Sequence, residues 1–511
     1  MKTLRDVSLL AAPLFVLLSA CGGGGGGGSP AVSDTSTPPA ASTPTPGSGD
    51  LTPAIVASNT VQNLCEKPRS GNASDRQGSL LNELTWVRSW IDESYLWYKE
   101  VPTTYLPQNF STPIAYFNVL KTPATTASGK LKDRFHFTYT TAEWEASLKG
   151  VELGYGMLLA LTQTTPPRKA VITIVEPGSP AALAGLQRGD VLQTVDGVDF
   201  VNAAGQASVD TINAALFPAA QGRHTVSFLR NGASINASLQ SIAVNTSAVQ
   251  NERIIDTPTG KVGYLTFNTH NNVAERQLVD TMRRFQAAGI SDLVLDVRYN
   301  GGGLLDVASE LAYMIAGPQT TSGKTFEQII ANDKIRREAP LGFHAQSQGL
   351  ASANPLAKGT ALPYLGLKRV TLLTTGNTCS ASEAIINGLR GVDVEVNLIG
   401  GTTCGKPYGF YPQPNCGTTY FAVQFQGVNA KGFGDYADGM APTCAVADDY
   451  QHALGDANEA MLAAALQYRN TGRCTLPTGM SRLLGTVESS ETVAARLLRP
   501  QYKEIAIGRQ P

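Results

Sequence analysis

Charged residues are scarce in this chain of 511 residues, and neither sign predominates. Lys, Arg, Asp and Glu together make up 16% of the residues, the formal net charge is −1, and no long basic run occurs. Because binding to a nucleic-acid backbone needs a basic surface, the composition argues against a nucleic-acid partner. No stretch reaches the ~18 consecutive apolar residues of a membrane-spanning helix. The body of the chain is therefore predicted to be soluble.

Histidine is also rare, and no histidine lies near a cysteine at a metal-ligand spacing. The chain has 5 histidines and 7 cysteines, and the cysteine spacings fit no zinc-ribbon pattern. We therefore predict no metal and no other cofactor. Six cysteines remain when Cys21, which belongs to a processing signal, is set aside: Cys65, Cys379, Cys404, Cys416, Cys444 and Cys474. An even number in an exported chain predicts disulfides, but the sequence does not choose among the many possible pairings.

The amino terminus has the pattern of a bacterial lipoprotein signal. Lys2 and Arg5 give a basic start, residues 7–18 (VSLLAAPLFVLL) form a short apolar core, and LSAC ends at Cys21. This pattern resembles a lipobox, in which signal peptidase cuts before a cysteine that then receives a lipid. Residues 1–21 are therefore predicted to be the signal, with Cys21 as the lipidation site. The alternative is an ordinary secretory signal with a chance cysteine.

Residues 22–59 consist mainly of Gly, Pro, Ser and Thr, starting with seven consecutive glycines. Such a segment cannot bury enough apolar surface to fold, so it is predicted to be a disordered linker. A flexible coil of this length would hold the body roughly 30–35 Å from the anchor. Gly22 rather than Asp follows Cys21, which in the enteric sorting rule indicates the outer membrane. We expect a lipid-anchored protein of the bacterial cell envelope that faces the periplasm or the exterior.

Two modules are expected next, and the first of them carries no evident chemistry. Residues 60–145 are predicted to be a small N-terminal helical domain, because one apolar stripe follows a helical period. The stripe comprises Leu80, Leu84, Val87, Trp90, Ile91 and Tyr95. Residues 146–245 instead contain short strands and two helices, including VITIV (171–175) and GSPAALAGLQRGDVLQTVDG (178–197).

The order of elements in residues 146–245 resembles a PDZ domain of the circularly rearranged kind found in bacterial proteases. The resemblance makes LGYG (153–156) the carboxylate-binding loop, with Gly154, Tyr155 and Gly156 as the candidate substrate-binding residues. Consecutive amides in a glycine-containing turn bind anions, and a peptide tail would add to the sheet as an extra strand. The alternative is a scaffold domain with an inactive groove.

Residues 250–475 alternate between apolar strands and amphipathic helices, which predicts an α/β sheet with crossover helices. Ligands bind at the carboxyl ends of the strands in such folds. Three loops leave those ends and are expected to converge: 299–303 (YNGGG), 376–382 (GNTCSAS) and 401–406 (GTTCGK). The stretch 318–368 has no pattern that predicts its structure, and the extension 476–511 is either a docking helix or a loose segment.

The three loops carry the residue types needed for acyl transfer. Ser380 precedes a helix and has the capping-box spacing to Glu383, so a plain helix start is the alternative interpretation. A serine in the field of a helix N-terminus still needs a base. Lys406 can serve if burial disfavours its charged form. The run Gly301–Gly303 lets backbone amides approach an oxyanion. Together these residues predict a Ser-Lys hydrolase.

Residues 75–475 resemble the carboxyl-terminal processing (tail-specific) serine peptidases. DVRYNGGG (296–303) matches the family's aspartate-hydrophobe-arginine stretch that leads to paired glycines, SASE (380–383) matches its serine-alanine-serine-glutamate motif, and Gly405-Lys406 matches its glycine-lysine pair. The resemblance implies a crotonase-like catalytic domain with a mixed sheet. It also implies the site residues: Ser380 as nucleophile, Lys406 as general base, the amides of Gly302 and Ala381 as the oxyanion hole, and Glu383 as a residue that fixes the site.

Three features distinguish this chain from the usual family pattern. The interval from Ser380 to Lys406 is one residue longer than the usual spacing, and Phe410 stands where the family often has glutamine. Cys379 and Cys404 flank the two catalytic residues, and we predict that they form a disulfide that braces the two loops. A role for Cys379 as the nucleophile is less favoured, because an exported cysteine tends to be oxidised.

His270 ends the strand KVGYLTFNTH, so it is a further candidate near the site. A tricorn-like relative would use a histidine as the base. Because Lys406 already fits that role, a structural or substrate-contacting role is the favoured interpretation of His270.

The sequence thus predicts a lipid-anchored serine endopeptidase that cleaves proteins near their C-termini by a Ser-Lys dyad. Its PDZ domain would recognise the substrate tail, so its partners are proteins or peptides with exposed C-termini, and the membrane through the lipid. The first alternative is a non-catalytic binding lipoprotein on the same fold, as in the retinoid-binding repeats of the eye. The second is an adaptor that presents tails to another protease. The joint presence of Ser380 and Lys406 favours the enzyme, and the oligomeric state is not predicted.

Overall fold

The computed structural model describes residues 17–18, 55–351, 353–475 and 496–498. Cys21, nearly all of the predicted signal and most of the predicted linker lie outside the described residues. So does the predicted extension 476–511, except for residues 496–498. Within the described ranges, no helix is both long and apolar enough to cross a membrane.

The N-terminal part is built around α2 (Leu80–Ser94), the helix predicted from the apolar stripe. Ser79 caps this helix through reciprocal hydrogen bonds with Asn82. The stripe faces the core, where Val87 and Tyr95 are fully buried. The other elements are α1 (Ser58–Val61), β2 (Leu64–Cys65), β3 (Arg76–Gln77), η1 (Tyr98–Glu100), η2 (Pro107–Asn109), α3 (Pro113–Val119), β4 (Phe137–Thr140) and α4 (Thr141–Leu148).

This N-terminal part shares its hydrophobic core with a distant stretch of the chain. Phe410 and Phe421 belong to the same buried cluster as Trp86 of α2. Strand β4 pairs with β23 (Thr418–Phe421), which pairs in turn with β22 (Gln413–Asn415). The N-terminal part is therefore continuous in structure with residues that follow the candidate base, and it is positioned to contribute to the site.

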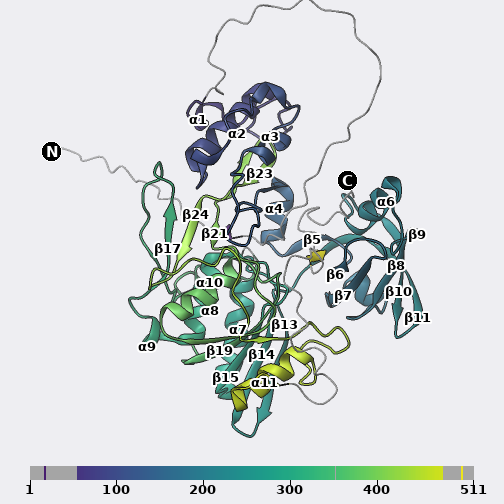
Figure 1. The fold of residues 1–511 in the computed structure, drawn as a ribbon, viewed down its shortest axis with the longest axis vertical. Coiled ribbons are helices and arrows are strands. Elements are labelled where there is room, and N and C mark those ends of the chain that lie inside the picture. Colours follow the sequence, from purple (N-terminus) through teal and green to yellow (C-terminus); the bar gives the residue numbers. More distant parts are fainter. Residues whose placement is uncertain (1–16, 19–54, 352, 476–495, 499–511) are drawn as a thin grey trace, which may run out of the picture.

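The second part is a β-rich unit, at the right of Figure 1. Its sheet has the order β11-β10-β8-β7-β6-β26, where β26 is Arg496–Leu498, and β9 is paired to β8. The predicted strands and helices are present, which confirms the PDZ-like fold. The bounds are β5 (Val151–Gly154), β6 (Met157–Gln163), β7 (Lys169–Val175), α5 (Pro180–Leu183), β8 (Val191–Val195), β9 (Val198–Asp199), α6 (Gln206–Leu216), β10 (Arg223–Arg230), β11 (Ala233–Gln240) and β12 (Ile242–Asn245).

The third part contains a six-stranded sheet of order β13-β14-β15-β19-β20-β25. Only β13 runs antiparallel to its neighbour, so the sheet is mixed, as predicted. The bounds are β13 (Val249–Thr257), β14 (Gly260–Phe267), β15 (Asp292–Asp296), β19 (Arg369–Thr374), β20 (Glu395–Gly400) and β25 (Cys444–Ala445). The parallel strands β15, β19 and β20 end at the same edge of the sheet, and this arrangement positions the three glycine- and serine-rich loops.

Helices cover both faces of this sheet (Figure 1). Helices α7 (Ala274–Ala288), α8 (Leu305–Ala316) and α10 (Ala381–Gly391) pack on one face, and α11 (Ala460–Thr471) packs on the other. All five residues of β15 are buried as a result. Burial on both faces explains the unbroken apolar run from which a parallel strand was predicted.

The segment 318–368, for which no structure was predicted, contributes to a second sheet. It contains α9 (Pro318–Thr321), β17 (Thr325–Ala331) and β18 (Leu341–Gly342). The sheet order is β18-β17-β24-β21, with β24 (Phe425–Val428) and β21 (Tyr408–Gly409). Strand β21 begins two residues after Lys406, so this sheet supports the chain on that side of the site.

Three disulfides join the described cysteines in pairs: Cys65–Cys416, Cys379–Cys404 and Cys444–Cys474. The predicted pairing of Cys379 with Cys404 is confirmed. The first bond attaches the N-terminal part to the hairpin of β22 and β23. The third attaches the end of α11 to β25.

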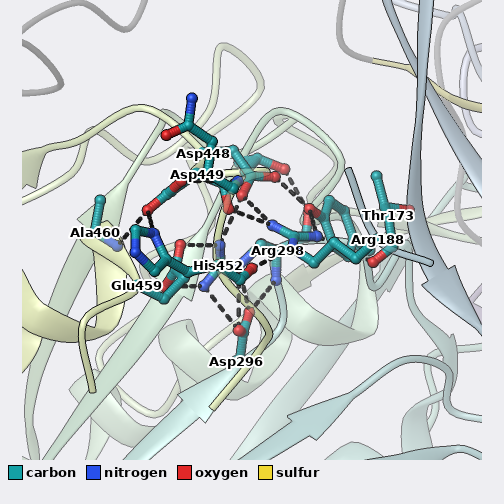
Figure 2. A network of polar contacts seen from close by, with 12 residues as sticks. Thr173, Arg188, Asp296, Arg298, Asp448, Asp449, His452, Glu459 and Ala460 are labelled. Carbon is teal, nitrogen blue, oxygen red and sulfur yellow. Dashed lines mark hydrogen bonds and ion pairs between the residues drawn. The ribbon is translucent and has the colours of Figure 1, made fainter. Parts of the chain in front are cut away.

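A buried network of charged side chains joins the PDZ-like part to the third part (Figure 2). Arg188 lies at the PDZ end of the network, where it donates to Asp448 (2.8 Å) and to the hydroxyl of Tyr299 (2.7 Å). Tyr299 in turn donates to Asp448. Because Tyr299 belongs to the loop 299–303, the network connects the PDZ-like part directly to one of the three loops at the sheet edge.

Candidate active site

The three loops at the carboxyl ends of β15, β19 and β20 meet, as predicted. The carbonyl of Asn300 accepts the amide of Cys379 (3.1 Å) and the hydroxyl of Ser382 (3.0 Å). The amide of Cys404 donates to the carbonyl of Thr378 (3.1 Å). The loop 376–382 thus lies between the other two, and Ser380 stands at the centre of the group.

Ser380 occupies a sharp turn immediately before α10. Its backbone has φ 59° and ψ −117°, in the left-handed half of the map that a non-glycine residue rarely adopts. Its side chain is 1% exposed in the described structure, and its hydroxyl has no hydrogen-bond partner among the described residues. Strained backbone and a buried hydroxyl without a partner are both typical of a functional residue.

Glu383 connects the turn at Ser380 to the turn at Lys406. Its Oε2 accepts the backbone amides of Ser380 (2.9 Å) and Lys406 (2.8 Å), and its Oε1 accepts the amide of Gly405 (2.9 Å) and the hydroxyl of Thr403 (2.6 Å). Burial raises the pKa of the Glu383 carboxyl above its ordinary value, while these hydrogen bonds act in the opposite direction. One carboxylate therefore fixes the backbones of both candidate catalytic residues.

The Cys379–Cys404 disulfide is a second link between the same two turns. Cys379 directly precedes Ser380, and Cys404 lies two residues before Lys406. The bond uses the sulfur of Cys379, so this residue is not a free thiol nucleophile in the structure. The sulfurs of both cysteines and the carboxylate of Glu383 are close enough to hold a metal, but a disulfide leaves no thiolate to bind one.

Removal of this disulfide is expected to impair the site more than the fold. Replacing Cys379 and Cys404 together by Ala should lower turnover roughly 10- to 100-fold, because small displacements of catalytic groups are costly. The matched control replaces Cys444 and Cys474 by Ala, which should lower the melting temperature and leave turnover close to that of the parent. Turnover of both double variants on one reporter protein, with their melting curves, checks this. Equal turnover in the two would show that the disulfide does not brace the site.

Lys406 lies among aromatic rings. It is 1% exposed, and its Nζ is 3.9 Å from the ring centroid of Phe410 and 5.4 Å from that of Phe135. Phe410, which stands where the resembling family often has glutamine, thus offers the face of its ring to the lysine. Phe135 comes from the N-terminal part, for which no chemistry was predicted.

The N-terminal part also holds the backbone of the Lys406 turn. The guanidinium of Arg134 donates to the carbonyls of Cys404 (2.7 Å) and Gly405 (3.3 Å) and to that of Ala437 (3.2 Å). Sequence reasoning missed Arg134 and Phe135. The only signal for them was their place next to the strand β4, whose partner β23 follows the lysine in the chain.

Gly302 lies against Ser380, in a conformation that requires glycine. Its φ is 108°, and a Cβ at this position would lie 2.9 Å from the Cβ of Ser380 and 3.0 Å from the amide nitrogen of Ala381. The amide of Gly302 donates to Oδ1 of Asn300 (2.9 Å). The two amides predicted to bind an oxyanion are therefore adjacent, and one of them has Asn300 as its present acceptor.

His270 belongs to the support of this glycine loop. It is fully buried, its amide donates to the carbonyl of Gly302 (3.1 Å), and its carbonyl accepts the amide of Leu304 (2.8 Å). Its Nδ1 lies 3.1 Å from Oδ1 of Asn300, whose Nδ2 donates to the carbonyl of Phe267 (2.9 Å). These contacts favour the structural role for His270. Sequence reasoning also missed Asn300, whose one signal was its place beside the glycine run.

The candidate carboxylate loop of the PDZ-like part lies at a hollow in the surface. Gly154, Tyr155 and Gly156 line it together with apolar side chains, among them Leu216 and Phe217 at the end of α6. Asn268 and Thr269 line the same hollow, and they directly precede His270 in the chain. The candidate carboxylate loop and the two residues before His270 therefore line the same hollow.

The chain is similar to known proteins over all three parts. Residues 261–423 match the sequence profile of Peptidase family S41, residues 82–139 match that of the Peptidase S41 N-terminal domain, and residues 171–210 match that of a PDZ domain. Among solved structures, the chain resembles a Bacteroides fragilis protein assigned to the S41 proteases. This likeness has a TM-score of 0.58 and 26% identity, and it covers 76% of this chain and 97% of the other.

Two curated relatives have lower coverage. A Staphylococcus aureus protein named as a CtpA-like serine protease is 24% identical over 244 residues, which cover 46% of this chain and 47% of the relative. The chloroplastic C-terminal processing peptidase of Tetradesmus obliquus is 28% identical over 272 residues, 49% of this chain and 51% of the relative. The chain thus spans about half the length of each of these relatives.

Proposed function

Because the chain belongs to peptidase family S41, we propose that it is a serine endopeptidase that cleaves proteins near their C-termini by a Ser-Lys dyad. The observation that carries this proposal is the carboxylate of Glu383, which binds the backbone amides of both Ser380 (2.9 Å) and Lys406 (2.8 Å). A turn that only began a helix would not need its capping glutamate to fix a buried lysine of another loop as well.

In the proposed reaction, Lys406 accepts the proton of the Ser380 hydroxyl as the oxygen attacks a peptide carbonyl carbon. The amides of Gly302 and Ala381 stabilise the resulting oxyanion. The proton then passes from Lys406 to the leaving amine, and an acyl-enzyme remains. Lys406 next activates a water molecule that releases the acyl group. For these reaction steps to occur, the amide of Gly302 must release Oδ1 of Asn300 and donate to the oxyanion instead.

The proposed substrate path follows β16 (Gly303–Leu304), the strand after the glycine loop. A short extended segment of this chain, β1 (Leu17–Leu18), pairs antiparallel with β16 and also contacts β21. Strand β16 therefore has an edge beside Gly302 to which an extended backbone can add. We propose that a substrate adds to β16 in the same manner.

The proposed tail capture uses Gly154, Tyr155 and Gly156. Backbone amides of such a turn would bind the terminal carboxylate, and the apolar lining at Leu216 and Phe217 suits an apolar last residue. We further propose that the protein is attached to the cell envelope of a bacterium through a lipid at Cys21, facing the periplasm or the exterior. The sequence pattern LSAC supports this location.

One experiment tests the activity and the tail recognition together. A soluble chain that begins near Leu51 is incubated with an unfolded reporter protein, whose C-terminus is apolar and either free or amidated. Cleavage of both reporters, at least several-fold faster for the free carboxylate, is the expected result. Equal rates would contradict carboxylate capture. Tight binding of the tail without any cleavage would support the alternative, a binding lipoprotein on the same fold.

A further inference from the structure

A short segment near the end of the described chain occupies the edge of the PDZ-like sheet. This strand, β26 (Arg496–Leu498), pairs antiparallel with β6, with Arg496 opposite Leu161 and Leu498 opposite Leu159. In Figure 1 it is the short, unlabelled yellow strand beside β6. Without β26, β6 would be the last strand of the sheet on this side. An edge strand presents unpaired backbone groups, and these are the groups to which a peptide adds.

The direction of β26 is that of a bound tail. Strand β6 starts at Met157, directly after the candidate carboxylate loop, and runs away from that loop. An antiparallel partner of β6 therefore runs toward the loop. In β26, the chain advances from the position opposite Leu161 to the position opposite Leu159, which is the nearer of the two to the loop.

Strand β26 also lies beside the hollow at the carboxylate loop, which is the candidate tail-binding groove. The hollow at the carboxylate loop is lined by Met157 and Leu159 of β6 and by Leu216 at the end of α6. A peptide that pairs with β6 at Leu159 therefore borders this hollow. The chain itself thus places an extended backbone where the proposed function requires the backbone of a substrate tail.

We propose that β26 is an internal ligand of the tail-binding groove, which competes with substrate tails and weakens their binding. This inference rests on the proposed tail capture. A ligand tethered to its own protein has an effective concentration in the millimolar range, so even a weak contact can raise the apparent Kd of an external tail about tenfold. Substrates with high affinity or high local concentration would displace it, and others would be excluded.

The test measures tail binding in the absence of cleavage. All proteins carry Ser380→Ala, and the probe is a fluorescent peptide of ten residues with an apolar C-terminal residue, either as the free acid or as the amide. Fluorescence anisotropy gives the Kd for three chain lengths: the whole chain, a chain that ends at Pro500, and a chain that ends at Thr475. The last retains Cys474 and its disulfide but lacks β26.

The three chain lengths are expected to differ in their Kd for the free-acid probe, in a defined order. The chain that ends at Thr475 should bind the free-acid probe about tenfold more tightly than the whole chain. The chain that ends at Pro500 retains β26 and carries a terminal carboxylate two residues after Leu498, whose partner Leu159 lies two residues after the start of β6. Its own terminal carboxylate should then fill the loop, so it should bind the probe most weakly of the three.

A point substitution tests the strand without deleting it. Leu497→Pro in the whole chain removes a backbone N–H and should tighten probe binding as much as deletion does. Ser490→Pro, in the same segment but outside β26, should leave the Kd unchanged. Hydrogen exchange at residues 157–163 should be faster in Leu497→Pro than in the whole chain without probe, because β6 then lacks a partner.

Two other outcomes distinguish a failure of the internal-ligand proposal from a failure of the proposed tail capture. If the free-acid probe binds equally to all lengths and to Leu497→Pro, the internal ligand is wrong while the proposed tail capture stands. If neither probe binds to any of the proteins, including the chain that ends at Thr475, the proposed tail capture is wrong. The internal-ligand proposal, which rests on it, is then wrong as well.

Discussion

Replacing Ser380 by Ala is expected to lower turnover of an unfolded reporter protein by roughly 10⁴-fold or more. A catalytic dyad acts as a unit, so removal of either member costs most of the rate, and the remainder comes from binding and oxyanion stabilisation. Lys406→Ala should therefore cause a loss of similar size. Because Ala is smaller than either side chain and Glu383 holds the backbone of both turns, the fold should be retained.

The chain provides a close control for this experiment. Ser382 lies two residues further on and is also buried, but its hydroxyl donates to the carbonyl of Asn300 (3.0 Å). Ser382→Ala removes that hydrogen bond and should cost about 0.5–1.5 kcal/mol of stability, with turnover within tenfold of the parent. The rates of the three variants are measured by the appearance of reporter fragments, with melting temperatures as the test of folding.

His270 provides the discriminating comparison. If Lys406 is the base, His270→Gln should retain most of the turnover, since its contacts to the glycine loop are made largely by its backbone. Retained turnover in Lys406→Ala together with its loss in His270→Gln would reverse the assignment of the base. Retained turnover in Ser380→Ala would exclude Ser380 as the nucleophile.

The replacement of Arg298 by Met is expected to destabilise the protein by roughly 3–5 kcal/mol or to prevent folding. The guanidinium of Arg298 is fully buried and binds three carboxylates: those of Asp296, Asp448 and Glu459. Burial alone would lower the pKa of Arg298, but these carboxylates raise it well above its ordinary value. Methionine would fill the space of the side-chain stem and leave the buried carboxylates of Asp296 and Glu459 without an ion-pair partner among the described residues, while Asp448 would keep Arg188.

Arg276→Met is the matched control for this substitution. Arg276 pairs with Asp280 one helical turn away, and both side chains are 35% exposed. A surface pair of this kind contributes little, so the control should lie within about 0.5 kcal/mol of the parent. The free energies of unfolding are compared by denaturant titration. A loss below 1 kcal/mol in Arg298→Met would show that the network is not needed for stability.

A second substitution tests whether unpaired buried charge causes this loss of stability. Burial opposes the ionisation of Asp448, but Arg188 and Arg298 hold its pKa below the usual value. Asp448 keeps Arg188 as an ion-pair partner in the Arg298→Met protein, whereas Arg298 is the one ion-pair partner of Glu459 among the described residues. An additional Glu459→Gln therefore removes an unpaired buried charge and should restore part of the lost stability. A double variant that is less stable than the single one would indicate that packing, rather than charge, dominates.

The fold was predictable from the sequence where a local pattern coincided with the tertiary environment. The apolar run at residues 293–297 gave β15 because both faces of that strand are buried, and the stripe of α2 gave its helix because one face is. The segment 318–368 gave no prediction, since β17 is stabilised by β24, a strand about one hundred residues away in the sequence. Pairing over such a distance leaves no local signal.

The candidate site was predictable to a similar extent. Ser380, Glu383 and Lys406 lie in short motifs, and the pairing of Cys379 with Cys404 followed from the expected approach of their neighbours. Arg134, Phe135 and Asn300 act through contacts that only the folded chain creates. The sequence could indicate which loops meet, but it could not indicate which side chains of other elements fill the space around them.

The disulfide from Cys65 to Cys416 has a consequence for how the chain can be oxidised. Its two cysteines are 351 residues apart, whereas the other two bonds span 25 and 30 residues. If each cysteine of the six paired with the next one along the chain, Cys65 would join Cys379, and Cys404 would join Cys416. Only the bond between Cys444 and Cys474 would then be native. Formation of the native bonds therefore requires Cys65 to stay unpaired until Cys416 is available, or an isomerase to exchange the first bonds that form.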